Sequence, residues 1–393
     1  MREQLWNEGW KFWEDKDSFA LVWDVPENAK DVTLPHDAMI EKKAYPESPN
    51  GGSTGFRDGD AYTYVRLFTP EPDWNGKRIL VRFEGVYMNA MVYLNGQFLT
   101  KNPFGYTTFY ADLTDYLKEG EENELRVQVR AGAMTNSRWY SGAGIYRDVS
   151  LLLLPMVHVV PEGIFVKTER LGEDMAVLSV QAELHNRSER AERFSAEAFI
   201  LGSNGDEKAK QEKPVFLRAG EKRTMRFSMA VSEPELWSEE LPVLAKAVVR
   251  LKGEEGVWDE AETLFGIRTI TADGKCGLLM NGRPVKLRGA CIHHDSGMLG
   301  TATYEAAELR RVKLLKEAGF NAIRMSHHPA AAALLRACDQ LGVFVMDELS
   351  DMWNRMKSGY DYGLSFSEWW ERDAKAMVRK DRNHPSVILY SIG

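Results

Sequence analysis

The chain has 393 residues, of which 44% are hydrophobic and 27% are charged, and its formal net charge is −8. This length predicts two or three domains with apolar cores of their own, and the composition excludes a disordered chain. The acidic balance leaves no basic excess to neutralise phosphates, so we expect no nucleic-acid partner.

The first residues, MREQLWNEGWKFWEDKD, are charged where a signal peptide needs an apolar core. No stretch approaches the roughly 18 apolar residues of a membrane helix. We therefore expect a cytoplasmic protein with no membrane partner, or a secreted one whose leader has been removed. The three cysteines, Cys276, Cys291 and Cys338, are odd in number and lack CxxC spacing, which favours reduced thiols over disulfides or a zinc site.

Residues 1–155 contain short runs in which apolar and polar residues alternate, and this pattern predicts an antiparallel β-sandwich. The pair Asn95-Gly96 inside one run is a hairpin signal. The turn-rich stretches Leu34–Asp37 and Pro46–Gly59 are candidates to reach over a neighbouring domain. The alternating runs are Tyr62–Pro70, Lys77–Val86, Ala90–Leu99 and Asn123–Gly132.

Residues 156–267 continue the β character in further runs, such as Arg193–Leu201 and Lys222–Val231. Roughly seven strands over about 110 residues fit a small immunoglobulin-like sandwich. The segment lacks the Cys–Trp–Cys core of antibody domains, and we expect it to act as a spacer.

Residues 268–393 change to strands that alternate with helices in units of about 25 to 40 residues, which predicts a parallel sheet. The predicted strands are Val285–Cys291, Phe320–Met325, Val343–Glu348 and Ser386–Ile392. The predicted helices are Thr303–Gly319, Ala330–Gly342 and Ser365–Asp381.

Polar residues follow the first three of these strands. In a barrel of alternating strands and helices, reacting groups gather at the carboxyl ends of the strands, so three polar ends predict one shared mouth that binds a ligand. The residues at these ends are His293, His294, Asp295, Arg324, His327, His328, Asp347, Glu348 and Trp353.

Three interpretations of this set are open. A metal site would use the His, Asp and Glu side chains, but neighbours such as His293 and His294 point to opposite faces of a strand, and no HxH or HExxH spacing occurs. A hydroxyl-rich ligand would suit donors from His and Arg, acceptors from Asp, Glu and Asn, and the apolar face of Trp353. In the third interpretation, Arg324 only forms a rim ion pair with a neighbouring carboxylate.

Taken together, these residues resemble glycoside hydrolase family 2, the family of β-galactosidases and β-glucuronidases. Met325, His328 and Tyr390 depart from the residues usual at their positions in that family. The stretches that carry the resemblance are Trp139–Leu152, Met280–Asp295, Asn321–Glu348 and Asp381–Gly393.

The resemblance implies a jelly-roll β-sandwich over residues 1–155, an immunoglobulin-like β-sandwich over 156–267 and the first half of a (β/α)8 TIM barrel over 268–393. It also implies that Asn-Glu follows Gly393, that this Glu is the general acid/base, and that the nucleophilic Glu lies further on. We therefore expect no catalytic residue in this chain, and we expect the chain by itself to hydrolyse nothing.

The resemblance also implies the roles of residues that are present. His293 and His327 match histidines that bind sugar hydroxyls and stabilise the transition state, and Arg324 matches an arginine that orients the nucleophile. Asp347 and Asn383 match parts of the framework around the acid/base strand. The expected substrate-binding set is His293, His327, Arg324, Asp347, Asn383 and Trp353.

The implied activity is that of a retaining, exo-acting glycosidase with a carbohydrate substrate. Ser137–Arg147 favours a β-galactosidase, with β-glucuronidase as the nearest alternative and a non-catalytic carbohydrate-binding fragment as the alternative from another class. Some relatives have an acidic residue near Arg138 and a magnesium ligand after the third strand, but neither has an evident equivalent here, so we expect no metal and no cofactor. An unclosed sheet edge favours a homo-oligomer.

Overall fold

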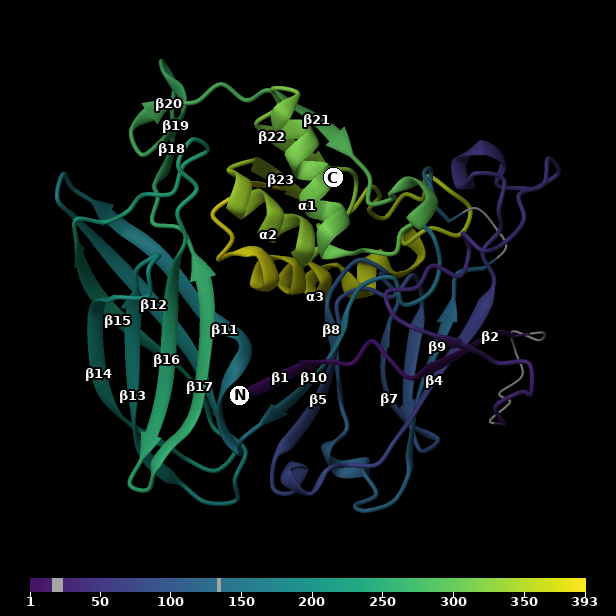
Figure 1. The fold of residues 1–393 in the computed structure, drawn as a ribbon, viewed down its shortest axis with the longest axis horizontal. Helices are drawn as coiled ribbons and strands as arrows, with labels where there is room; N and C mark the ends of the chain where they lie inside the picture. Colours follow the sequence, from purple (N-terminus) through teal and green to yellow (C-terminus); the bar gives the residue numbers. More distant parts are fainter. Residues whose placement is uncertain (16–23, 133–135) are drawn as a thin grey trace.

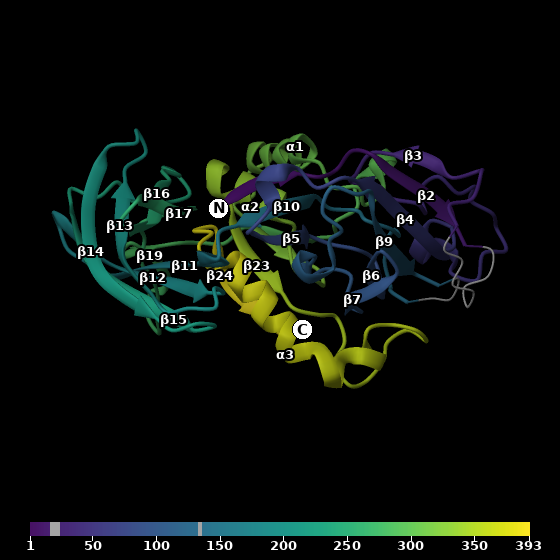
Figure 2. The ribbon, with the colours of Figure 1, turned by 90° about the horizontal axis from the view of Figure 1, so that it is seen from below.

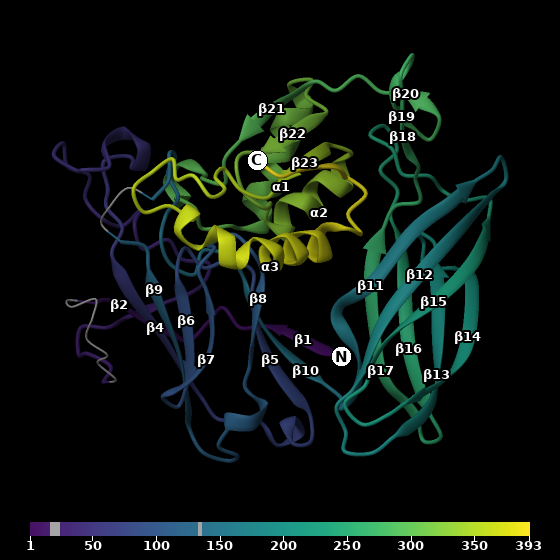
Figure 3. The same cartoon turned by 180° about the vertical axis from the view of Figure 1, so that it is seen from behind.

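The computed structural model describes residues 1–15, 24–132 and 136–393, which form three regions in chain order (Figure 1). Two β-sandwiches stand side by side, and a parallel sheet with its helices lies across one end of both (Figure 3). This arrangement confirms the predicted fold class, two sandwiches followed by part of a barrel.

The first sandwich packs a six-stranded antiparallel sheet, order β3-β2-β4-β9-β6-β7, on a four-stranded one, order β1-β10-β5-β8. The predicted run Ala90–Leu99 is the hairpin β6–β7, because Asn95 and Gly96 both adopt positive φ in its turn. The strands are β1 (Arg2–Leu5), β2 (Trp10–Glu14), β3 (Lys30–Val32), β4 (Ala61–Phe68), β5 (Arg78–Phe83), β6 (Ala90–Leu94), β7 (Gln97–Asn102), β8 (Phe109–Asp112), β9 (Asn123–Arg130) and β10 (Val149–Leu154). Short 3-10 helices are η1 (Gly51–Thr54), η2 (Pro72–Trp74) and η3 (Thr114–Tyr116).

The second sandwich has seven strands, as the sequence predicts, in sheets of order β11-β12-β15 and β14-β13-β16-β17. Alternate residues of both sheets face a shared apolar core, so along a strand such as β12 buried residues alternate with half-buried ones. The strands are β11 (Val157–Leu171), β12 (Met175–Asn186), β13 (Glu192–Leu201), β14 (Glu207–Leu217), β15 (Lys222–Ser232), β16 (Ala245–Gly253) and β17 (Gly256–Phe265).

A small antiparallel sheet then leads into the parallel region. It consists of β18 (Ile270–Asp273), β19 (Gly277–Met280) and β20 (Arg283–Pro284), which the sequence reading did not separate from the strands around it. The parallel sheet has the order β21-β22-β23-β24, the order of the chain. Its strands are β21 (Gly289–Ile292), β22 (Ala322–Met325), β23 (Phe344–Glu348) and β24 (Val387–Ser391), and its helices are η4 (Gly297–Leu299), α1 (Glu305–Glu317), α2 (Ala332–Leu341) and α3 (Gly363–Asp381).

Both sandwiches hold this parallel region in place. Helix α3 runs from one sandwich to the other (Figure 2), and its Asp373 accepts a hydrogen bond from Thr107 of the first sandwich while Arg379 pairs with Glu183 of the second. The turn Leu34–Asp37 reaches the parallel region as predicted, because Asp37 accepts hydrogen bonds from the backbone N–H and the hydroxyl of Thr301. Among the described residues, no helix combines the length and apolar character needed to cross a lipid bilayer.

Candidate functional site

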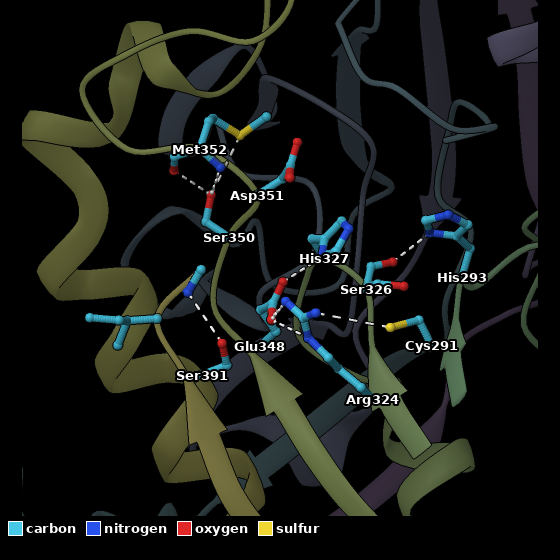
Figure 4. Close-up of polar contacts among 12 residues, drawn as sticks. Cys291, His293, Arg324, Ser326, His327, Glu348, Ser350, Asp351, Met352 and Ser391 are labelled. Carbon is cyan, nitrogen blue, oxygen red and sulfur yellow. Dashed lines mark hydrogen bonds and ion pairs between the residues drawn. The ribbon is translucent and has the colours of Figure 1, made fainter. Parts of the chain in front are cut away.

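Glu348, the last residue of β23, organises the polar mouth of the parallel sheet (Figure 4). Its fully buried carboxylate accepts two hydrogen bonds from Arg324 on Oε2, from Nε at 2.8 Å and Nη2 at 2.6 Å. His327 donates from Nδ1 to the other oxygen, Oε1, at 2.5 Å. The hydrogen bond to Glu348 raises the pKa of Arg324 above its ordinary value. A guanidinium and an imidazole are thus fixed on one carboxylate.

Strand geometry decides which side chains reach this mouth. Arg324 and Glu348 are on neighbouring parallel strands and point to the concave face of the sheet. Asp347 points to the opposite face, where it is buried against the helices and accepts the backbone N–H of Ala330 at 2.8 Å. Asp347 therefore lies in the framework beneath the mouth, which is the position that the resemblance implies for it.

His293 lies opposite His327, with ring centroids 6.2 Å apart. Its Nδ1 lies 2.5 Å from the carbonyl oxygen of Ser326, and a carbonyl only accepts, so Nδ1 carries the proton. The same argument applies to Nδ1 of His327 on the Glu348 carboxylate. When each imidazole is neutral, its Nε2 is therefore the accepting nitrogen, which suits the hydroxyl hydrogens of a sugar.

Trp139 adds a residue from the first sandwich to this site. Its ring stacks on that of His293, with centroids 5.1 Å apart and planes 11° apart, and meets His327 edge-on at 5.7 Å. The sequence reading did not select Trp139 as a site residue, although it begins the stretch that resembles the family jelly roll. Its loop lies more than 150 residues from His293, so only the packing of the two domains brings the rings together.

His294 and His328 form a second pair that faces away from the mouth. Both are buried at the seam with the first sandwich, where His294 Nδ1 and His328 Nε2 are 3.0 Å apart. Burial, reinforced by the charge of Arg147, lowers the pKa of His294 to about 3. Tyr106 stacks on His328 with ring centroids 4.1 Å apart. His293 and His294 therefore point to opposite faces, as expected. His294 and His328 pack between the two domains as buried, neutral side chains.

The remaining two members of the predicted set lie apart from the histidines. Asn383 precedes β24, so it lies at the amino end of the sheet, where its amide bonds Ile164 and Val166 of the second sandwich. Asn383 is therefore distant from the mouth, and these bonds fit the framework role that the resemblance implies. Trp353 is half exposed and its indole N–H donates to the carbonyl of Ile392 at 2.6 Å, so it borders a neighbouring pocket.

Arg138, on the loop of the first sandwich, forms a salt bridge with Asp351. Its guanidinium donates to both oxygens of Asp351, from Nε at 2.9 Å and Nη2 at 2.5 Å. In residues 1–15, 24–132 and 136–393, no three His, Cys, Asp or Glu side chains form a group that could hold a metal ion. The three cysteines are free, as predicted.

Two β-sandwiches and a parallel sheet, whose strand ends carry histidines, an arginine and a carboxylate beside an aromatic ring, define a modular protein with a polar site at a domain seam. Three matches to family descriptions cover the chain in order. Residues 36–155 match the sugar binding domain of glycosyl hydrolases family 2, residues 157–268 match the model described as glycosyl hydrolases family 2, and residues 273–393 match the TIM barrel domain of the same family. The chain belongs to glycosyl hydrolase family 2.

Relatives with names or structures agree with this assignment. The chain is 40% identical to the β-galactosidase BoGH2A of Bacteroides ovatus over 92% of its own length and 42% of that protein. A solved family 2 member from Bacteroides cellulosilyticus superposes with a TM-score of 0.96 at 38% identity, over all of this chain and 52% of that one. A β-glucuronidase structure from Bacteroides uniformis gives 0.86 at 28% identity, over 99% and 46%. The chain spans about half the length of these relatives.

Proposed function

We propose that residues 1–393 form the sugar-holding side of a retaining, exo-acting β-galactosidase active site. The observation that carries this proposal is the fixed set of Arg324, His327 and Glu348 opposite His293, with Trp139 as an aromatic wall. Two imidazole acceptors, a charged donor and a ring face together match the hydroxyls and apolar patches of a pyranose. The 40% identity to a protein named β-galactosidase supports the choice of sugar.

In this proposal the two carboxyl groups that do the chemistry come from sequence beyond Gly393. A retaining glycosidase holds them about 5 to 5.5 Å apart, and one protonates the leaving oxygen while the other attacks the anomeric carbon. His293 and His327 accept hydrogen bonds from the sugar through Nε2, and Glu348 fixes the orientation of Arg324 toward the concave face. Because both carboxyl groups are missing, residues 1–393 alone bind sugar without hydrolysing it.

The assay of this proposal uses the full-length enzyme that carries residues 1–393. We expect hydrolysis of 4-nitrophenyl β-galactoside with retention of configuration, and a fall in kcat/KM of about 10²-fold in H293Q and in H327Q, the loss typical of a misplaced reactant. The matched control is H185Q, because His185 is in the second sandwich, far from the mouth. Losses in the control as large as in the two site variants would contradict the assignment.

The nearest alternative is a β-glucuronidase, which is favoured by the likeness to the Bacteroides uniformis enzyme of that name. The two sugars differ at two carbons. A glucuronide carries a carboxylate at C6 where a galactoside carries a hydroxymethyl group, and the hydroxyl at C4 has the opposite configuration. Parallel assays with 4-nitrophenyl β-glucuronide decide between them, since the preferred sugar has the higher kcat/KM.

A carbohydrate-binding fragment without catalysis is the alternative from another class. Calorimetric titration of residues 1–393 with galactose, glucuronate and a β-linked oligosaccharide tests it. Binding that H327Q abolishes places the sugar at the barrel mouth, whereas binding that H327Q leaves intact favours a site on the first sandwich.

A further inference from the structure

A pocket of about 700 Å3 opens near His293 and His327, between the first sandwich and the loop that follows β23. Its lining residues are Arg138, Asp351, Met352, Trp353, Asn354, Arg355, Met356, Lys357 and Gly393. Met352 also borders the space next to His327, and Arg138 is the neighbour of Trp139, whose ring stacks on His293. The pocket therefore adjoins the mouth that is proposed to hold the sugar ring, and Figure 4 shows two of its lining residues, Asp351 and Met352, on the segment that follows Glu348.

Among the described residues that line this pocket, cationic side chains outnumber acidic side chains by three to one. Asp351 is buried and binds two of them, Arg138 through both oxygens and Lys357 through Oδ1 at 3.0 Å. Burial raises the pKa of Asp351, but the hydrogen bonds from Arg138 and Lys357 outweigh it and the pKa lies below its usual value. One carboxylate thus balances one of the two bound cations, and both of these remain about half exposed.

The third cation, Arg355, is exposed and has no ion-pair partner among the described residues. It is on a loop that Asp361 fixes from beneath, since this buried carboxylate accepts the backbone N–H groups of Lys357 and Ser358, each at 2.7 Å, and of Gly363 at 2.9 Å. The cationic loop is therefore held in a defined shape.

Trp353 supplies the apolar wall of the pocket. The bond from its indole N–H to Ile392 holds its ring against the end of β24, and half of the residue stays exposed. An exposed indole beside uncompensated cations is suited to a ring that carries a negative charge, because the ring face packs on the indole while the charge meets the cations.

We propose that this pocket binds the unit next to the terminal sugar and that this unit is anionic, so that the enzyme prefers acidic β-glycosides. The inference rests on the proposed exo-acting function, in which the neighbouring unit is the leaving group. Uronate carboxylates and sulfate esters share the required chemistry, a negative charge on a ring. Arg355 is a specificity-determining residue that acts on the leaving group.

The test compares two substrates of the full-length enzyme that differ in charge at one ring position. These are 4-carboxyphenyl β-galactoside, which is anionic at pH 7, and 4-(hydroxymethyl)phenyl β-galactoside, which is neutral. We expect a higher kcat/KM for the anionic glycoside, and we expect R355Q to reduce this advantage about fivefold, the upper range for an exposed charge pair. The advantage of the anionic glycoside should also shrink when the ionic strength is raised to about 1 M, because the Debye length then falls to about 3 Å.

The matched control is R283Q, because Arg283 is exposed on β20 and makes no ion pair within the described part of the chain. A glycoside with a sulfate at the same position separates the two anions, since the larger advantage identifies the preferred one. Equal kcat/KM values for the anionic and neutral glycosides, or an advantage that R355Q leaves unchanged, would overturn the inference.

Failure of the proposed function gives a different result, namely no turnover of either glycoside or of the matching pair of β-glucuronides. Calorimetric binding of the same two galactosides then makes the comparison without hydrolysis. Tighter binding of the anionic compound that is lost in R355Q would support the pocket assignment, and equal binding would reject it.

Discussion

Asp347 and Asp381 form a buried acidic pair beneath the candidate site. Each has an Oδ2 atom without another hydrogen-bond partner, and Lys380, itself nearly buried, binds Oδ1 of Asp381. Burial raises the pKa of Asp381 well above its ordinary value, Lys380 opposes this shift, and Asp347 adds to it. The raised pKa favours the protonated form of the Asp381 carboxyl group, and the ammonium group of Lys380 lies beside it.

This pair predicts a pH dependence of stability. The pKa of Asp381 is higher in the folded than in the unfolded state, so the stability it contributes is present at low pH and is lost as pH rises through the folded pKa. The variant D381N keeps a neutral donor toward Asp347, and we expect its stability relative to the parent protein to increase from pH 5 to pH 8. Urea unfolding across this range measures it, and a difference that is constant with pH would contradict a bound proton.

Replacement of Glu348 by its amide is predicted to reduce catalytic efficiency. In E348Q the amide offers one acceptor where the carboxylate serves both Arg324 and His327, so one of the two side chains faces an N–H group. We expect kcat/KM of the full-length enzyme to fall about 10²-fold through misplacement of these groups. The exposed Glu262, paired with Lys246 in the second sandwich, provides the control E262Q, for which we expect activity unchanged.

Among the elements, β24 is anchored at its start by one residue of α2. The buried Asp339 carboxylate accepts hydrogen bonds from Ser386 N at 3.1 Å, Ser386 Oγ at 2.6 Å and His384 Nδ1 at 2.5 Å. The backbone carbonyl of Asp339 also accepts the indole N–H of Trp237 from the second sandwich at 2.9 Å. This residue therefore links α2, β24 and the second sandwich.

Removal of this anchor should loosen β24 before the rest of the sheet. We expect D339A to lower the free energy of unfolding by about 2–4 kcal/mol, since it leaves buried donors without an acceptor. Hydrogen exchange of Val387–Ser391 should accelerate more than that of β22. The control D115A removes an exposed carboxylate and should change stability by less than about 0.5 kcal/mol. Equal losses in both variants would contradict the anchoring role.

The success of sequence reasoning differs between elements. Alternating strand and helix periods are local signals, so helix α1 was predicted as Thr303–Gly319 and is observed as Glu305–Glu317. The pairing of His293 with His327 could be predicted as well, because parallel strands bring their carboxyl ends together. The approach of Trp139 depends on how two domains pack, and no local period records it. The bonds from Asn383 to the second sandwich likewise depend on how two domains pack, so no local period predicts them.

At the scale of the whole molecule, the parallel sheet is closed by its helices on one face and open on the other. Within the described residues β21 and β24 each pair with a single neighbouring strand, so each leaves an edge free. The concave face contains a pocket of about 220 Å3 with an apolar lining that includes Leu287, Ile388 and Leu389. Leu287 and Leu389 are more than one third exposed.

These features predict that residues 1–393, prepared alone, associate through the concave face, because association removes apolar surface and strand edges from water. We expect sedimentation velocity to show oligomers that grow with concentration, and we expect L389K to shift the population toward monomer by placing a charge on this face. The control L264K changes a leucine of similar exposure on β17, away from the sheet, and should leave association unchanged. A monomer at all concentrations, with slow hydrogen exchange in β24, would show instead that the two sandwiches are enough to protect the open sheet.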